Sequence, residues 1–173
     1  MSGRWRCACC GTGHEGVFDL VANAPDFWPH EVAPEPNSAL RFDGDFLSDD
    51  FCVLGGDQYF IRCGFEIPVQ GLERKFGFGC WSSVSGDSLD LYLDHFNDGG
   101  YEGVGPWTGW FANSLAGFPE TLNQPCWIHP QPNRDRPLIT FANEDHPLAV
   151  AQATGIEAKR LLEIYAGSGH APG

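Results

Sequence analysis

Two cysteines and a histidine near the start of the chain have the residue types and the spacing of metal ligands. Cys7 and Cys10 form a C-x2-C pair, which lets two thiolates face one metal ion, and His14 follows four residues later. Gly11 lies directly behind the pair and can adopt the positive φ that a tight turn requires. This knuckle, residues 7–14, therefore predicts a zinc site with Cys7, Cys10 and His14 among its ligands.

A closed structural zinc site needs four ligands, so the rest of the sequence must supply one more. Cys52 is the favoured candidate, because the strand start at residues 49–52 could lie beside the N-terminal strand. Cys9 and His146 are the reserves. The same knuckle also fits a simple turn that carries two thiols and no metal. A thioredoxin-like redox pair fits less well, since Gly11 and the residues after it do not readily open a helix.

Three further residues could take part in catalysis but have simpler interpretations. His146 follows two carboxylates and precedes Pro147, so it could act in acid–base chemistry or belong to a polar turn that caps a helix. Cys80 or Cys52 could be the nucleophile of a cysteine-dependent enzyme, although such cysteines are more often small buried hydrophobes. We prefer the structural interpretation in each case. The chain has no phosphate-binding loop of the GxxxxGK[ST] type.

The charge balance excludes several classes of partner. The chain carries 23 acidic and 10 basic residues and a formal net charge of −13, so it repels the phosphate backbone of nucleic acids. The acidity favours solubility and would also suit a basic protein partner. No apolar run approaches the roughly 20 residues that span a bilayer, and no secretory signal is visible, so no membrane association is expected. The 7 scattered cysteines favour thiols and metal thiolates in a reducing compartment, and we expect a cytoplasmic protein.

Length and patterning predict a single domain, residues 1–173, of the α+β class. We expect a mostly antiparallel sheet with a mid-chain helix, two C-terminal helices and the N-terminal cysteine knuckle. Along the chain this gives a metal-knuckle segment at 1–20, a sheet-rich core with one helix at 40–142 and a helical C-terminus at 143–167. The proline-rich residues 23–39 are expected to cross the surface without regular structure.

Local patterns place the individual elements. Ser85 is predicted to cap the mid-chain helix, and residues 154–157 to form a capping box for the last helix. Residues 98–109 are predicted to be a long exposed loop, and the last six residues to fray. The alternation in residues 58–69 predicts a strand with one apolar face. The predicted strands lie at residues 5–6, 51–54, 58–69, 75–84, 109–115, 126–129 and 136–141.

Eight segments in chain order carry a resemblance to a known family, and together they cover nearly the whole chain. They are CxxCGxxHEG at 7–16, SDDFCV at 48–53, YFIRCGFEIP at 59–68, FGCWSSVS at 78–85, FPET at 118–121, RP at 136–137, DHPLA at 145–149 and GI at 155–156. On these segments the chain resembles the domain of unknown function 2199 family of bacterial proteins. The resemblance implies a cytoplasmic bacterial protein and no particular activity. In this family an aliphatic residue is expected where Cys80 stands, which argues against Cys80 as a shared nucleophile.

Two functional hypotheses follow. The first is a zinc-stabilised, non-enzymatic binding or regulatory protein, for example an immunity-like protein, whose acidic surface would contact a basic partner. The alternative is a metal-dependent hydrolase in which Cys7, Cys10 and His14 hold the zinc and Glu15 is the base. A fourth protein ligand would close the site and exclude the hydrolase. The sequence leaves the oligomeric state open.

Overall fold

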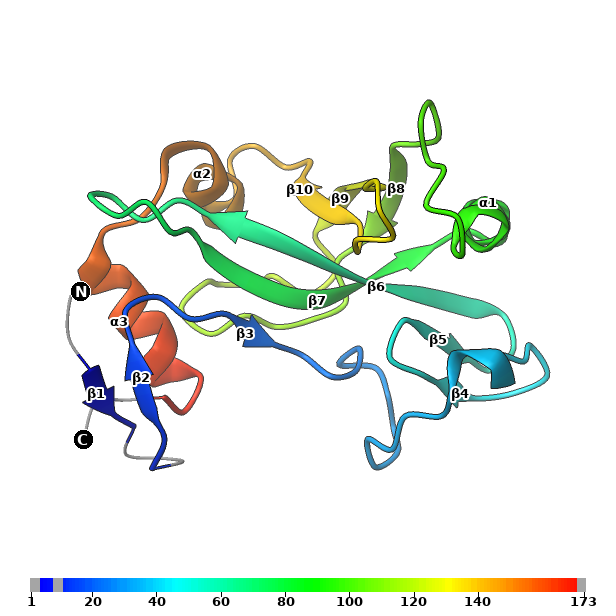
Figure 1. Ribbon diagram of the computed structural model, residues 1–173, viewed down its shortest axis with the longest axis horizontal. Helices are drawn as coiled ribbons and strands as arrows, with labels where there is room; N and C mark the ends of the chain where they lie inside the picture. Colours follow the sequence, from blue (N-terminus) through cyan, green and yellow to red (C-terminus); the bar gives the residue numbers. More distant parts are fainter. Residues whose placement is uncertain (1–3, 8–10, 171–173) are drawn as a thin grey trace.

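The computed structural model describes residues 4–7 and 11–170 of the chain, and its described part has an α+β fold (Figure 1). Strands predominate, with one α-helix in mid-chain and two at the C-terminal end of the described residues. The strands are β1 (Arg4–Arg6), β2 (Gly13–Glu15), β3 (Leu20–Val21), β4 (Phe46–Leu47), β5 (Phe51–Leu54), β6 (Gln58–Ile67), β7 (Phe76–Val84), β8 (Trp107–Trp110), β9 (Pro125–His129) and β10 (Leu138–Phe141). The helices are a 3₁₀ turn (Asn37–Ala39), α1 (Gly86–His95), α2 (Pro147–Thr154) and α3 (Ala158–Gly167).

The main sheet is mixed, which corrects the prediction of a mostly antiparallel sheet. Its strand order is β3-β7-β6-β10-β9-β8, and β5 and then β4 extend it from the other half of β6. Two pairings are parallel, β3 with β7 and β10 with β6, while the remaining ones are antiparallel. Both parallel pairs join segments far apart in the chain. The long loops and helices between them provide the crossovers that parallel strands need.

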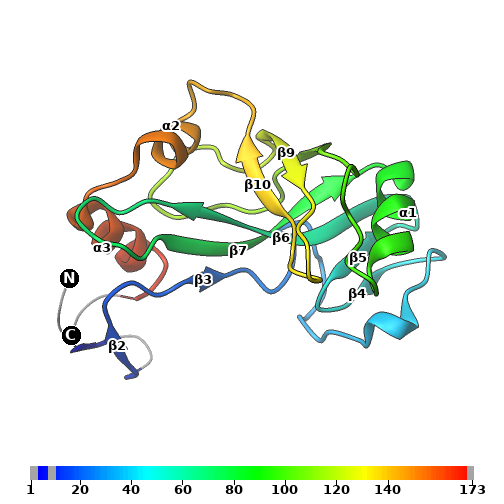
Figure 2. The ribbon, with the colours of Figure 1, turned by 45° about the horizontal axis from the view of Figure 1, so that its top comes forward.

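The sheet curls strongly around its core. Directly after β8, Phe111 forms an isolated antiparallel bridge with Ser82 of β7. The β8 edge of the sheet therefore curls back to β7, which lies near the opposite edge. The curl buries residues on both faces of β6 and β7 over much of their length. The prediction for β6 named one buried apolar face, whereas part of its second face is buried as well. Figure 2 shows β6 and β7 crossing the middle of the molecule, with α2 over one end and α1 near the other.

Helix boundaries follow side-chain caps in two of the three α-helices. Ser85 caps α1 as predicted, because its hydroxyl accepts a hydrogen bond from the Ser88 N–H at 3.1 Å. His146 caps α2, and Pro147 occupies the first turn. The predicted capping box before α3 is wrong. Thr154 instead donates its hydroxyl to the Val150 carbonyl at 2.9 Å, and Glu157 makes no side-chain cap.

The segment predicted as a long exposed loop is partly buried. Tyr101 packs inside with its hydroxyl donated to the Tyr92 carbonyl at 2.9 Å, and the two rings stack. Trp107 is also buried and begins β8. The glycines around these aromatic residues allow sharp turns, so the loop can fold its two large rings onto α1. Burial of these two rings outweighs the glycine-rich character that suggested an exposed loop.

β1 and β2 form a hairpin that stands apart from the main sheet. Within the described residues, these strands pair only with each other, with Trp5 opposite His14. In Figure 1 the hairpin lies beside α3 at one end of the molecule. Isolated two-stranded hairpins are marginally stable in water, so this hairpin depends on its contacts with α3 and the segment that follows it. None of the described helices is both long and apolar enough to cross a bilayer.

Candidate functional site: a metal centre between the chain termini

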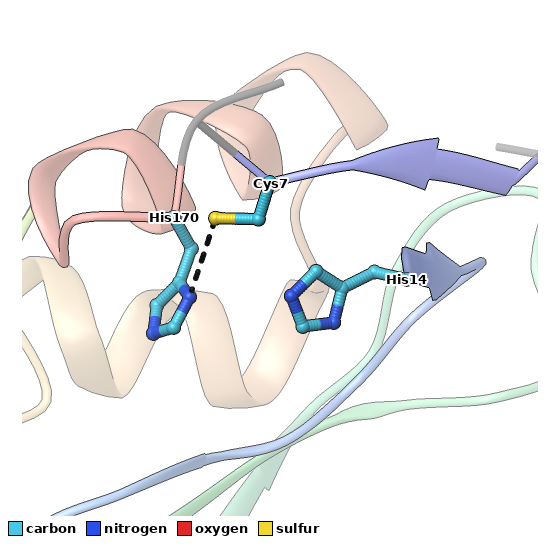
Figure 3. Close-up of side chains that lie close together, drawn as sticks. All are labelled: Cys7, His14 and His170. Atoms are coloured by element: carbon cyan, nitrogen blue, oxygen red, sulfur yellow. Dashed lines mark hydrogen bonds between the residues drawn. The ribbon is translucent and has the colours of Figure 1, made fainter. Parts of the chain in front are cut away.

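Three potential metal ligands converge where the N-terminal hairpin meets the end of α3. The Sγ of Cys7 and one ring nitrogen each from His14 and His170 all lie within 4.8 Å of one another. The Cys7 Sγ is 3.8 Å from the His170 Nδ1 (Figure 3). Figure 3 shows the three side chains pointing toward one common space from three separate backbone segments. The side chain of Cys7 is buried, and both histidines are partly exposed.

The hairpin turn positions the first two ligands. The Cys7 N–H donates to the Thr12 carbonyl at 2.9 Å, and the Cys7 carbonyl accepts from the Gly11 N–H at 3.0 Å. Gly11 has a φ of +67°, as the knuckle predicted, and a side chain there would be strained. The turn therefore leaves Cys7 just beyond β1 and sends the chain back along β2, where His14 faces the same space.

A C-terminal cap on α3 positions the third ligand. The His170 N–H donates to the Tyr165 carbonyl at 2.7 Å, and the Gly169 N–H donates to the Ala166 carbonyl at 3.1 Å. With Gly169 in the left-handed region (φ +84°), this is a Schellman motif. The prediction that the last six residues fray is therefore wrong for residues 168–170. Their backbone is hydrogen-bonded, and it turns His170 toward the hairpin.

A stack of aromatic rings orients His14. The His14 ring stacks on Phe18 with centroids 4.1 Å apart, and Phe18 stacks on Tyr165 at 4.0 Å. The Tyr165 hydroxyl donates to the Phe18 carbonyl at 2.7 Å and accepts from the Phe18 N–H at 3.0 Å. Burial raises the pKa of Tyr165, so its hydroxyl remains a neutral donor at neutral pH. Tyr165 thus fixes the backbone of Phe18, and Phe18 fixes the plane of the histidine ring.

The separation of the Cys7 and His170 ligand atoms is near that of two ligands on one zinc ion. With Zn–S and Zn–N bonds of about 2.3 and 2.0 Å, tetrahedral angles put a sulfur and a nitrogen ligand about 3.5 Å apart. The observed separation between Cys7 and His170, 3.8 Å, is close to this value. One thiol and two imidazoles form a donor set that suits zinc better than the hard cations magnesium or calcium.

A groove of about 520 Å³ opens beside the three ligands. His14 and His170 line one end of it, and Asp19 and Phe18 contribute to its wall. The Asp19 carboxylate accepts a hydrogen bond from the Gly77 N–H at 3.1 Å and is more than half exposed. The candidate metal position is therefore reachable from solvent along one side.

The structure does not bring the predicted ligand Cys52 to this group. Cys52 lies in β5, which pairs with β4 and β6 rather than with the N-terminal strand. Figures 1 and 2 place β5 at the opposite end of the molecule from β1 and β2. Cys52 is buried in a small second core with Phe60 and Trp81, and burial raises the pKa of its thiol to about 12. Cys10 and the reserve Cys9 lie outside the described residues.

His146 has the structural role that we preferred for it. Its Nδ1 accepts the Leu148 N–H at 3.1 Å, so its Nε2 carries the proton and donates to the Pro119 carbonyl at 2.8 Å. Both ring nitrogens thus join the start of α2 to the loop before β9. A histidine held in this way serves as a helix cap and as an anchor for the C-terminal helices.

The surroundings of the remaining described cysteines make them poor nucleophiles. Cys63, Cys80 and Cys126 are all buried in the main core. Burial raises the thiol pKa of Cys63 and Cys80 well above the ordinary value, and that of Cys126 to about 11. A nucleophilic cysteine needs a stabilised thiolate and access for a substrate. The interpretation of Cys80 as a small buried hydrophobe is therefore the better one.

His170 is the site residue that the sequence analysis missed. It stands in a small, glycine-rich tail with no ligand spacing to any other residue. The available signal was Gly169, which fits the C′ position of a helix that ends in a Schellman motif. Recognising that cap would have predicted an ordered turn at residues 168–170, although not that it meets the knuckle.

The chain belongs to a bacterial protein family. The model of the domain of unknown function 2199 family, described as an uncharacterised protein conserved in bacteria, matches residues 6–156. The resemblance noted in the sequence is thereby confirmed. The matched region contains Cys7, Cys10 and His14 and ends before α3 and His170. No curated protein and no solved structure matches the chain.

Proposed function

We propose that Cys7, His14 and His170 bind a zinc ion that fastens the N-terminal hairpin to the end of α3, in a protein that acts by binding rather than by catalysis. The observation that carries this proposal is the convergence of three potential ligand atoms within 4.8 Å, two from the N-terminal hairpin and one from the turn after α3. The proposal keeps Cys10 as the fourth ligand on the ground of its C-x2-C spacing alone.

A structural role for the metal is supported by the weakness of the hairpin. A two-stranded sheet of three residues per strand has little stability of its own. A zinc ion bound by both ends of the chain would close a loop that spans almost the whole domain. Metal binding free energy would then appear as folding free energy of the hairpin and of the C-terminal turn.

A binding role is supported by the chemistry of the other polar groups. The buried thiols of β5, β6, β7 and β9 have raised pKa values, and His146 uses both ring nitrogens in backbone contacts. The net charge of −13 favours a basic protein as the partner. We place this function in the cytoplasm, where a reducing environment keeps the Cys7 thiol reduced and available to a metal ion.

The groove beside the ligands favours a second candidate, a metal-dependent hydrolase. In that case a water molecule would occupy the fourth zinc position and the groove would hold the substrate. Glu15 is poorly placed to be the base, because neighbours in a strand point to opposite sides and His14 faces the metal. Asp19, which lines the groove, is the better placed carboxylate. A fourth protein ligand would exclude this candidate.

Elemental mass spectrometry on untagged protein, purified without chelator, tests the zinc proposal. We expect about one zinc per chain in the wild type, and clearly less than half of that in Cys7→Ser and His170→Ala. His30→Ala is the matched control, because His30 is a surface histidine whose partner is Asp45 and it should leave the zinc content unchanged. Wild-type protein without zinc that also takes up none on dialysis against zinc would contradict the proposal.

A further inference from the structure

A second hollow, separate from the metal site, opens where β6 begins and β7 ends. It encloses about 410 Å³, a volume in the range of small-molecule pockets. Its wall comes from five stretches of chain: the loop before the 3₁₀ turn, the β5–β6 turn with the start of β6, the end of β7, the end of β8 and the loop before β9. The aromatic residues in the wall are Phe27, Tyr59, Phe60 and Trp110.

The aromatic side chains that line the hollow differ in their exposure. Phe60 is buried, Phe27 is 41% exposed, and the two rings are tilted to one another with centroids 6.0 Å apart. The Trp110 side chain is 57% exposed, which is unusual for so large an apolar group. Its backbone N–H donates a hydrogen bond to the Ser83 hydroxyl at 2.9 Å. A tryptophan on an anchored strand end and exposed to this degree provides a flat π-surface for a ligand.

The charge of the residues that line the hollow favours a cationic ligand over an anionic one. Asp57 is the one charged residue among the described residues that line the hollow. No described lysine, arginine or histidine lines it. The neutral polar groups there include Gln58 and Asn123. In a chain with a net charge of −13, an anionic ligand would be repelled and a cationic one attracted.

We infer that this hollow is a binding site for a small organic cation, a quaternary or otherwise alkylated ammonium compound. Its apolar substituents would lie against Phe27, Phe60 and Trp110, and its charge would be stabilised by the ring faces and by Asp57. Aromatic faces bind alkylated ammonium groups by cation–π attraction, which strengthens when the cation is desolvated. The inference is independent of the zinc site, which uses other residues at another part of the molecule.

Choline and its neutral isostere 3,3-dimethyl-1-butanol are the probes for this site. They have nearly the same shape and differ in charge, so the ratio of their dissociation constants isolates the cationic contribution. Titrations are followed by NMR on the tryptophan indole N–H signals, with the Trp110 signal identified by its loss in Trp110→Leu. We expect choline to shift the Trp110 signal saturably and to bind about fivefold or more tightly than the isostere.

Three variants extend this test. Asp57→Asn and Trp110→Leu, the latter followed on the backbone amide signals of residues 57–60, should each weaken choline binding about threefold or more and leave binding of the isostere within about twofold. Trp127→Leu is the matched control, since Trp127 is another exposed tryptophan of the same sheet that does not line this hollow. The inference is wrong if choline causes no saturable shift, if the isostere binds equally well, or if Trp127→Leu weakens choline as much as Trp110→Leu. Asp57→Asn keeps the test decisive if Trp110→Leu fails to fold.

Discussion

Removal of zinc by a strong chelator is expected to lower the melting temperature of the protein by about 10 °C. A ligand present at about a thousand times its dissociation constant stabilises a fold by about 4 kcal/mol, and each kcal/mol is worth about 2–4 °C in a domain of this size. The loss should be local first. In hydrogen exchange, the amides of β2 and of the turn at residues 168–170 should lose protection together, because one ion holds both. Those in the middle of β6 and β7 should keep theirs.

His170→Ala provides the control for this experiment. The variant lacks one of the three ligands, so its melting temperature should already be low and should change by no more than about 2 °C on chelation. His30→Ala, which alters an exposed histidine elsewhere, should respond to the chelator as the wild type does. A wild-type protein that melts at the same temperature with and without chelator would show that no metal stabilises the hairpin.

The Tyr165→Phe variant is expected to lose both stability and zinc affinity. The change deletes the hydrogen bonds to the Phe18 carbonyl and from the Phe18 N–H but keeps the ring that stacks on Phe18. Two lost hydrogen bonds at a partly buried site should cost about 2 kcal/mol in the free energy of unfolding. Because Phe18 orients His14, we also expect the zinc dissociation constant to rise about tenfold, as for other residues that support a metal ligand.

A second tyrosine separates the two effects. Tyr101→Phe removes the buried hydrogen bond to the Tyr92 carbonyl, on the face of the sheet covered by α1, and should lower stability alone. Denaturant melts and competition with a zinc-binding dye would measure both quantities in each variant. If Tyr165→Phe and Tyr101→Phe bound zinc equally well, the aromatic stack would have no part in orienting His14.

Local sequence signals predicted most of the elements but not how the strands pair. The Ser85 cap and the long strands β6 and β7 depend on neighbouring residues, so a pattern of a few positions reveals them. The parallel pairs β3–β7 and β6–β10 join segments separated by many tens of residues. Such pairing is decided by which surfaces the whole chain can bury together, and no short pattern encodes it.

The candidate site also combines residues that local spacing predicts with a residue that only long-range packing brings in. Cys7, Gly11 and His14 lie within one hairpin turn, so their spacing alone predicted that turn and two members of the Cys/His group. His170 joins them only through the packing of α3 against the hairpin. Cys52 was chosen because its strand could have paired with the N-terminus. The apolar residues beside Cys52 in β5 are buried where β5 pairs with β4 and β6. Their burial places Cys52 in the small second core, away from the N-terminal hairpin.

The zinc-edge X-ray absorption spectrum of the untagged, zinc-loaded protein reads the ligands of the metal directly. We predict a four-coordinate shell with sulfur at about 2.3 Å and imidazole nitrogen at about 2.0 Å. Cys7→Ser should reduce the sulfur contribution, and His170→Ala the imidazole contribution. Two sulfurs with two imidazoles would establish a closed structural site that includes Cys10. A shell of oxygen and nitrogen only, or a spectrum that neither variant changes, would contradict a zinc site at Cys7, His14 and His170.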